Sequence, residues 1–422
     1  MTSLEPTEPT LSSPKPHDPY AALRFRDFRL LVGGTFLAVV SEQMAGVAIG
    51  WELYERTGEP LALGLVGLVQ VVPAVLLALP AGHIADRFDR KWVTMVTMFL
   101  LALCSLGLGW FSLERTALFW VYLCLLGIGI ARTFQNPALA SLPAQLVPEE
   151  HFTNAVTWDT SVWQASSIIG PALGGFLIAL QGNATSVYFI TAATLLVVGI
   201  LVSLMRPRRV PPSAEALTLT SLLAGLRFIW DTKVILAAIT LDMFAVLLGG
   251  ATALLPIFAK DILQVGAAGL GWLRAAPAIG AVLAAVVIAH RPPFTRAGLT
   301  LLSVVTGFGI ATIIFGLSQS FLLSLLMLAL LGAFDNVSVV IRIALLLTRT
   351  PDAMRGRVNA VHYVFIGVSN ELGAFESGVA AALLGTVGAV AVGGIGTILV
   401  VLLIALIWPE IRRLGRLSTE EV

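Results

Sequence analysis

Residues 82–91 read Gly82-His83-Ile84-Ala85-Asp86-Arg87-Phe88-Asp89-Arg90-Lys91, and they interrupt two long apolar runs with five charged side chains. A connection this short and this charged predicts a tight loop at a membrane surface, because charged groups are costly within the hydrocarbon. Basic residues in short loops favour the cytoplasmic side, and carboxylates are stabilised near helix N-termini. The stretch therefore predicts a membrane protein with a cytoplasmic turn at this point.

The composition agrees, since 57% of the residues are hydrophobic and only 12% are charged. A net charge of +1 argues against a nucleic-acid partner. Both cysteines, Cys104 and Cys124, lie within apolar segments, so we expect neither a disulfide framework nor a thiolate metal site. The five histidines are scattered, and no phosphate-binding loop motif occurs. We therefore expect no metal, no cofactor, no enzymatic activity and no ATP-driven transport by this chain alone.

About 20 apolar residues span a bilayer as a helix, and the sequence contains twelve such segments. The fold class expected is an all-α integral membrane protein with two six-helix bundles. The segments are 28–54, 61–82, 91–113, 117–142, 153–180, 186–205, 234–259, 268–290, 297–317, 321–347, 358–383 and 385–408. The expected parts are a disordered cytoplasmic tail (1–23), the first bundle (24–205), a cytoplasmic linker (206–233), the second bundle (234–410) and a cytoplasmic tail (411–422).

The Lys and Arg residues predict the orientation. With the N-terminus inside, the tails and cytoplasmic connections hold 20 of the 26 basic residues. The outer connections hold only Arg56, Arg115 and Lys260. This asymmetry predicts that both termini are cytoplasmic.

An internal repeat supports two related halves. Gly67-x-x-Gln70-x-x-Pro73-Ala74 in the second segment matches Gly271-x-x-Arg274-x-x-Pro277-Ala278 in the eighth, at an offset of 204. Asn154-Ala155-Val156 matches Asn359-Ala360-Val361 at an offset of 205. Parallel halves with a site between them are typical of secondary transporters.

The loop also resembles the signature G-x-x-x-D-R-x-x-R-K of the major facilitator superfamily, which it matches at Gly82, Asp86, Arg87, Arg90 and Lys91. A plain positive-inside turn would account for the basic residues alone. The resemblance implies twelve helices around a central cavity, and a gating role for these five residues. In that role we expect Asp86 to lie near the start of the eleventh segment, around 355–358.

Two further motifs resemble those of exporters in the same superfamily. Gly170-Pro171-Ala172-Leu173-Gly174-Gly175 in the fifth segment is similar to the antiporter motif, although Ser166 replaces its usual leading glycine. Arg132-Thr133-Phe134-Gln135 is similar to a fourth-helix motif linked with proton coupling, with Asn136 where glycine usually follows. A structural role for Arg132, capping carbonyl groups near the inner surface, is the alternative interpretation.

Ionisable residues at membrane depth are candidates for function because unpaired charge there is costly. The proton-coupling candidates are Glu42, Asp242, Arg132, Glu371 and Glu376. Glu42 is preferred, because its neighbours are apolar apart from Ser41 and Gln43. The substrate-cavity candidates are Gln43, Gln135, Asn136, Asp335, Asn336, Arg342 and Asn370.

Three of these assignments carry geometric expectations. Asp335 and Arg342 share a helix face, and pairing with each other is an alternative to a cavity role. Glu371 and Glu376 are five residues apart, so both cannot face the cavity. Asp159 and Arg274 lie nearer helix ends and are expected to be structural.

The function expected is secondary transport, most specifically the proton-coupled export of a siderophore or another amphipathic small molecule. The resemblance to the enterobactin-exporter group rests on Asn136-Pro137-Ala138, Leu142-Pro143 and Gly249-Gly250-Ala251-Thr252-Ala253-Leu254-Leu255-Pro256. The partners implied are a small-molecule substrate, protons and membrane lipid, for a monomer in the bacterial inner membrane. The alternatives are a lipid or lysophospholipid carrier of the same fold and a non-transporting receptor or assembly protein.

Overall fold

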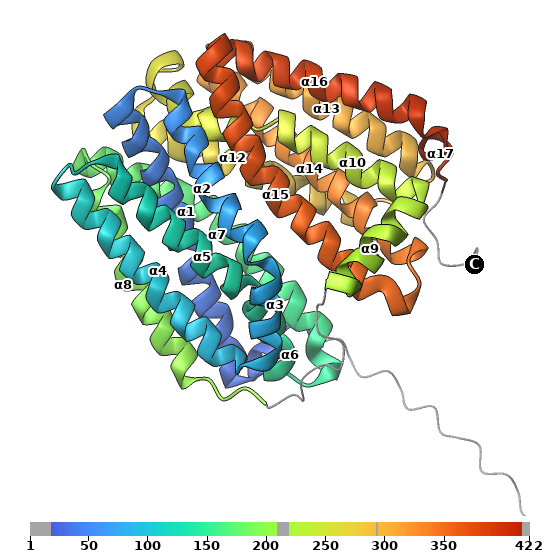
Figure 1. The fold of residues 1–422 in the computed structure, drawn as a ribbon, viewed down its shortest axis with the longest axis horizontal. Helices are drawn as coiled ribbons and strands as arrows, with labels where there is room; N and C mark the ends of the chain where they lie inside the picture. The colour runs from blue at the N-terminus through green and yellow to red at the C-terminus, as the bar shows by residue number, and fades with distance from the viewer. Residues whose placement is uncertain (1–17, 209–218, 293, 416–422) are drawn as a thin grey trace, which may run out of the picture.

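The computed structural model describes residues 18–208, 219–292 and 294–415, and helices dominate it (Figure 1). The first group of helices runs from α1 to α8. Its members are α1 (Arg26–Thr57), α2 (Pro60–Leu76), α3 (Ala78–Arg87), α4 (Arg90–Leu113), α5 (Leu118–Ser141), α6 (Pro143–Leu146), α7 (Phe152–Gln181) and α8 (Thr185–Leu204), with short 3-10 turns at Ala22–Arg24 and Glu149–His151.

The second group runs from α9 to α17 and lies beside the first (Figure 1). Its members are α9 (Leu219–Asp231), α10 (Lys233–Leu248), η3 (Ala251–Leu254), α11 (Leu255–Ile257), η4 (Phe258–Ile262), α12 (Gly266–Ala289), α13 (Ala297–Leu317), α14 (Phe321–Arg349), α15 (Asp352–Leu384), α16 (Thr386–Ile407) and α17 (Pro409–Arg412). The two groups correspond to the two predicted six-helix bundles.

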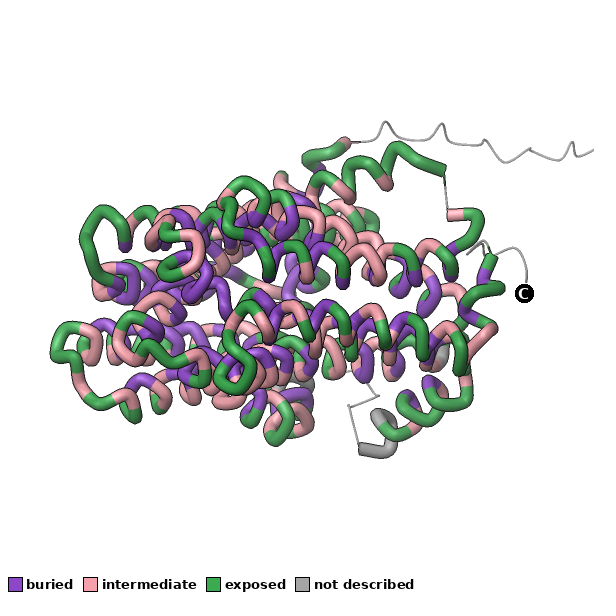
Figure 2. The backbone as a smooth tube through the Cα atoms, turned by 90° about the horizontal axis from the view of Figure 1, so that it is seen from above, coloured by how far each residue is buried: buried purple, intermediate pink, exposed green. Residues whose placement is uncertain are grey.

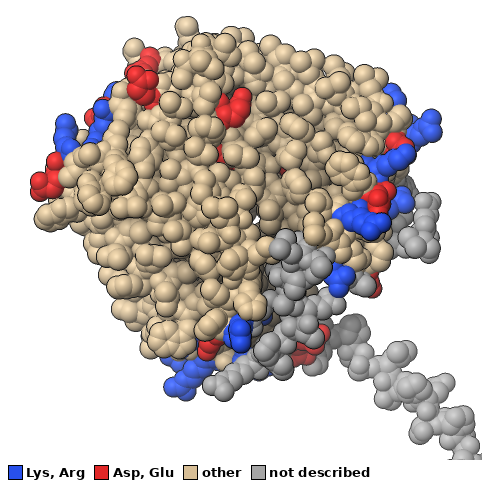
Figure 3. Space-filling model, in the orientation of Figure 1, with Lys and Arg blue, Asp and Glu red and all other residues tan. Residues whose placement is uncertain are grey.

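The helices have the length and composition of membrane spans. In the described residues, ten stretches are long and apolar enough to cross a bilayer, and the bent pair α2–α3 makes an eleventh. α15 is 33 residues long, and it is not among these stretches, so the structure identifies eleven of the twelve predicted spans in the described residues. Exposed positions follow the outer sides of the helices (Figure 2). On the face seen in Figure 3, most charged side chains lie near the rim and leave a broad uncharged area, as expected for a surface in contact with lipid.

The second predicted segment is broken. α2 ends at Leu76, and α3 begins at Ala78 with a bend of 56° between them. Pro80 has no N–H to bond the carbonyl of Leu76, and its ring would clash with that carbonyl in a continuous helix. The proline therefore turns the charged end of this segment away from the axis of α2.

The seventh predicted segment is also interrupted. Gly249 and Gly250 follow α10, and the chain continues as a 3-10 turn, one α-helical turn and a π-helical turn. A Cβ at Gly250 would lie 2.7 Å from the carbonyl oxygen of Gly373 in α15. The glycine pair thus permits the close approach of α15, and regular helix is lost there.

The predicted linker 206–233 is not only a connection, because its second half forms the helix α9. α9 packs against α15, where a Cβ at Gly225 would lie 2.8 Å from the carbonyl oxygen of Arg357. α15 itself begins at Asp352, before the expected start at 358. The expected disorder of residues 1–23 falls mostly outside the described residues, but Ala22–Arg24 forms a 3-10 turn.

Candidate functional site

A cavity of about 790 Å³ lies between the two bundles. The first bundle lines it mainly from α1, α2, α5 and α7, and the second from η3, α12, α14 and α15. A cavity of this size, with mostly apolar walls and a few polar groups, is typical of a small-molecule site. Its position between two related halves matches the place where secondary transporters bind their substrates.

The cavity is closed at one end by contacts between the bundles. α2 packs on α15 there, where a Cβ at Gly64 would lie 2.9 Å from the Cα of Gly378. On the other side of the cavity α7 packs on α12, and a Cβ at Gly271 would lie 2.6 Å from the carbonyl oxygen of Pro171. Backbones this close exclude larger side chains and water.

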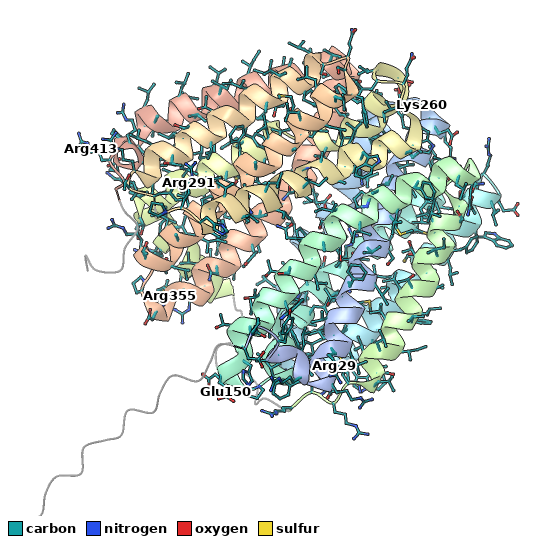
Figure 4. All side chains as sticks on the ribbon, turned by 180° about the vertical axis from the view of Figure 1, so that it is seen from behind. Arg29, Glu150, Lys260, Arg291, Arg355 and Arg413 are labelled. Atoms are coloured by element: carbon teal, nitrogen blue, oxygen red, sulfur yellow. The ribbon has the colours of Figure 1, made fainter. Side chains whose placement is uncertain are left out.

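Polar residues complete the closure at the same end. The hydroxyl of Tyr54 in α1 donates to the carboxylate of Asp261 in η4. The ammonium of Lys260 lies 5.6 Å from the centre of the Tyr54 ring, within the range of a cation–π interaction. Lys260 lies at the opposite end of the molecule from Arg29, Glu150 and Arg355, towards which the bundles diverge (Figure 4).

Three polar side chains meet on the cavity wall of the first bundle. The guanidinium of Arg132 lies 3.0 Å from the carboxylate of Glu42 and donates to the side-chain oxygen of Gln70 at 3.1 Å. The side chains of Arg132 and Glu42 are 37% and 23% exposed, so the pair faces the cavity. The sequence expectation that Glu42 has mainly apolar surroundings is wrong, because α5 places an arginine beside it.

A second ion pair lies inside the second bundle. Arg342 in α14 pairs with Asp242 in α10, and their side chains are only 2% and 10% exposed. Neither residue lines the cavity. The alternative pairing of Arg342 with Asp335 is therefore wrong, since residue separation on one helix does not reveal an acid on the neighbouring helix.

The other candidates divide between the cavity and the protein interior. Gln43, Asp335, Asn336, Asn370 and Glu371 line the cavity. The geometric argument about Glu371 and Glu376 is confirmed, since only Glu371 is on the cavity wall.

Gln135 and Asn136, the two polar candidates that follow Arg132, are not on the cavity wall. Gln135 is buried against the Met98 sulfur, with 3.5 Å between Nε2 and Sδ. Asn136 is exposed away from the cavity. Arg132 therefore faces the cavity, whereas Gln135 and Asn136, three and four residues later on α5, do not.

The motif residues have identifiable packing roles. Gly170 and Gly174 face α1, where a Cβ at Gly174 would lie 2.9 Å from the Cα of Met44. Gly175 faces α12, and α7 continues unbroken through Pro171. The predicted antiporter motif thus packs α7 between α1 and α12, the helix of the other bundle.

The predicted gating loop joins α3 to α4. The Asp89 carboxylate accepts from the backbone N–H of Lys91 at 2.9 Å and caps α4. The Lys91 ammonium donates to the carbonyl oxygens of Ser203 and Met205 at the end of α8, at 2.6 and 2.8 Å, where a cation is favoured. The Asp86 side chain, on which the expected latch depends, lies outside the described residues.

Arg274 is a cavity residue that sequence reasoning had assigned to the structure of a helix end. It lies in α12 and lines the cavity, as do Trp163 and Gln164 of α7. The repeat contained a signal for it, because Arg274 occupies the position of Gln70, which binds Arg132 in the first half.

Comparisons with known proteins identify the family to which the whole chain belongs. The family model described as "Transmembrane secretion effector" matches residues 17–416. The chain is 28% identical to the enterobactin exporter EntS of Escherichia coli O1:K1 over 394 residues, which covers 92% of both chains. It is 29% identical to the enterobactin exporter EntS of Citrobacter koseri, with the same coverage.

Solved structures of transporters share the fold at low sequence identity. A bacterial homologue of the human lysosomal transporter Spinster, in an inward-facing and occupied conformation, matches with a TM-score of 0.73 and 14% identity, over 94% of this chain and 98% of that chain. A POT family transporter in complex with 5-aminolevulinic acid matches with a TM-score of 0.73 and 13% identity, over 92% and 97% of the two chains. The chain therefore belongs to the transmembrane secretion effector family, and it is a multi-pass membrane transporter with the major facilitator fold rather than an enzyme.

Proposed function

We propose that this protein is a proton-coupled exporter of a siderophore or another amphipathic small molecule, working by alternating access. The observation that carries the proposal is the Glu42–Arg132 pair on the wall of a cavity that is closed at one end by contacts between the bundles. The two EntS proteins named above, which are enterobactin exporters, favour export of a molecule of this type.

Proton coupling requires a group whose protonation changes the preferred conformation. Glu42 fits this role, because its carboxylate lines the cavity, where water can reach it, and pairs with the guanidinium of Arg132. Protonation of Glu42 would release Arg132 and remove an attraction between α1 and α5. Asp242 remains the second candidate, and Glu371 the third, since it also lines the cavity.

The proposed topology places both termini in the cytoplasm of a bacterium and the protein in the inner membrane as a monomer. Residues 24–205 and 234–410 are the proposed bundles, and the positive-inside asymmetry supports their orientation. In this orientation the closed end with Tyr54 and Asp261 faces outwards, and the conformation is inward-facing. The five loop residues 82, 86, 87, 90 and 91 are the proposed inner gate.

A lysophospholipid carrier of the same fold is the second candidate. The mostly apolar cavity wall that favours it includes Leu63, Leu101 and Leu125, against which an acyl chain could pack.

The function is tested in proteoliposomes with the purified protein. We expect a catecholate siderophore to accumulate against its own concentration gradient when a pH gradient is imposed. When an ionophore collapses the pH gradient, the siderophore should reach equal concentrations on both sides and accumulate no further. Transport of lysophospholipid in place of the siderophore would select the second candidate. Transport of neither, by protein that keeps its fold, would contradict both.

A further inference from the structure

Arg274 is a cation in the cavity without a hydrogen-bond or ion-pair partner among the residues that the structure describes. The side chain is half-buried and lines the cavity. In the described part of the chain, no hydrogen bond or ion pair reaches its guanidinium group, although Arg132 and Arg342 each have a carboxylate. A guanidinium group carries five N–H donors. An unpaired charge at membrane depth costs on the order of several kcal/mol. The unpaired guanidinium of Arg274 therefore indicates a site where a ligand supplies the partner.

The position of the guanidinium is fixed by two glycines of α1. A Cβ at Gly46 would lie 2.9 Å from one terminal nitrogen of Arg274, and a Cβ at Gly50 would lie 3.6 Å from the other. Gly46 and Gly50 are four residues apart and share a helix face. Both are also cavity-lining residues. The guanidinium thus rests against bare backbone of the opposite bundle, held in place rather than extended freely.

The internal repeat explains why the acid is missing. In the first half, Arg132 binds Glu42 and Gln70. At the offset of 204 the matching residues of the second half are Asn336, Val246 and Arg274. The second half therefore has its cation at the glutamine position, and valine where the first half has the acid that neutralises its arginine.

The other carboxylates of the cavity do not supply the missing acid. Asp335 and Glu371 line the same cavity, but neither forms an ion pair with Arg274. Apolar residues of the same helix, Pro277, Ala278 and Ala281, continue the cavity wall beyond the guanidinium. A ligand that fits this surface has an anionic oxygen group for Arg274 and an apolar body along α12.

We infer that Arg274, seated between Gly46 and Gly50, is a binding subsite for an anionic oxygen group of an amphipathic ligand. A carboxylate or a catecholate would accept two parallel hydrogen bonds from the guanidinium group, a geometry that lysine does not offer. This inference rests on the proposed function, because it names the substrate class of the same cavity. The ligand is either the exported molecule itself or a lipid with an anionic headgroup.

The experiment compares ligands that differ only in charge. Binding of 1-naphthoate and of its neutral analogue 1-naphthamide is measured by calorimetry, with the full chain in nanodiscs of phosphatidylcholine. We expect the wild type to prefer the anion, and Arg274→Gln, which installs the residue of the first half, to lose that preference by about tenfold or more, as for a hydrogen bond to a charged group. Arg274→Lys should retain part of it.

Two further variants keep the test decisive. Gly46→Ala leaves the arginine in place but pushes its guanidinium away, so it should reduce the preference for the anion even if Arg274→Gln fails to fold. Arg412→Gln removes an exposed arginine from α17, distant from the cavity, and should leave the preference unchanged.

A second arm compares lysophosphatidylglycerol with lysophosphatidylcholine. Loss of anion preference in the naphthoate arm assigns the subsite to soluble molecules, and loss in the lipid arm alone assigns it to a headgroup. Equal anion preference in wild type, Arg274→Gln and Gly46→Ala in both arms would overturn the inference. Because binding is measured without transport, that result would leave the proposed export intact, whereas failure of the proteoliposome assay would not change the binding data.

Discussion

The two intramembrane ion pairs of this protein occupy opposite environments. Glu42 and Arg132 lie on the cavity wall with 23% and 37% of their side chains exposed, and water can reach both. Asp242 and Arg342 are enclosed between α10 and α14 with 10% and 2% exposed. A pair in contact with water can separate and rejoin at small cost, whereas a buried pair cannot. The comparison indicates that the first pair is suited to switching and the second to holding the second bundle together.

The largest expected effect comes from breaking the buried pair. Arg342→Met leaves Asp242 buried without a partner, and we expect it to lower the free energy of unfolding by about 3–5 kcal/mol. Arg132→Met, the matched change on the cavity wall, should cost about 1 kcal/mol or less because its partner stays hydrated. Thermal unfolding of the purified variants in detergent measures the difference. Similar losses in both variants would abolish the distinction between the two pairs.

The next effect concerns transport. Glu42→Gln mimics the protonated carboxyl, so we expect substrate binding and exchange to persist while the rate of uptake driven by a pH gradient falls about tenfold or more, a barrier change of about 1.4 kcal/mol. Asp242→Asn should lower the stability of the protein, whereas the transport that remains should still depend on the pH gradient. Transport and exchange in proteoliposomes measure both quantities. Gradient-driven accumulation at the wild-type level by Glu42→Gln would move the proton site to Glu371 or another carboxylate.

The smallest effect is conformational. Opening of the closed end would increase the access of water to the cavity pair Glu42–Arg132, but not to the buried pair Asp242–Arg342. Tyr54→Phe removes the hydrogen bond to Asp261 that links the bundles at the closed end, a contribution of about 0.5–1 kcal/mol because Asp261 is exposed and water can replace the lost donor. We expect the population of molecules open at that end to rise. An impermeant thiol reagent applied at that end should modify a cysteine introduced at Ala253, a cavity-lining residue of η3, faster in the Tyr54→Phe background. Unchanged labelling would mean that the glycine contacts alone close this end.

The spans and the family could be predicted from the sequence, because both depend on local patterns. Apolar runs long enough for a bilayer have no soluble alternative, and the predicted starts at 91, 297 and 321 lie within one residue of the observed helices. The breaks were less predictable. Pro80 could have indicated the bend after α2, whereas the interruption at Gly249 depends on how closely α15 approaches.

The site was only partly predictable, because charges in a membrane find their partners across helices. The sequence determined that Glu42, Arg132, Asp242 and Arg342 were functional or structural candidates, since each is an ionisable group at membrane depth. Only the tertiary structure decided that Glu42 binds Arg132 and that Asp242 binds Arg342. It also decided that Arg274, which forms no ion pair within the described residues, rests on two glycines of α1. Helical periodicity gives the direction of a side chain within its own helix, and the packing of the two bundles decides what that side chain meets.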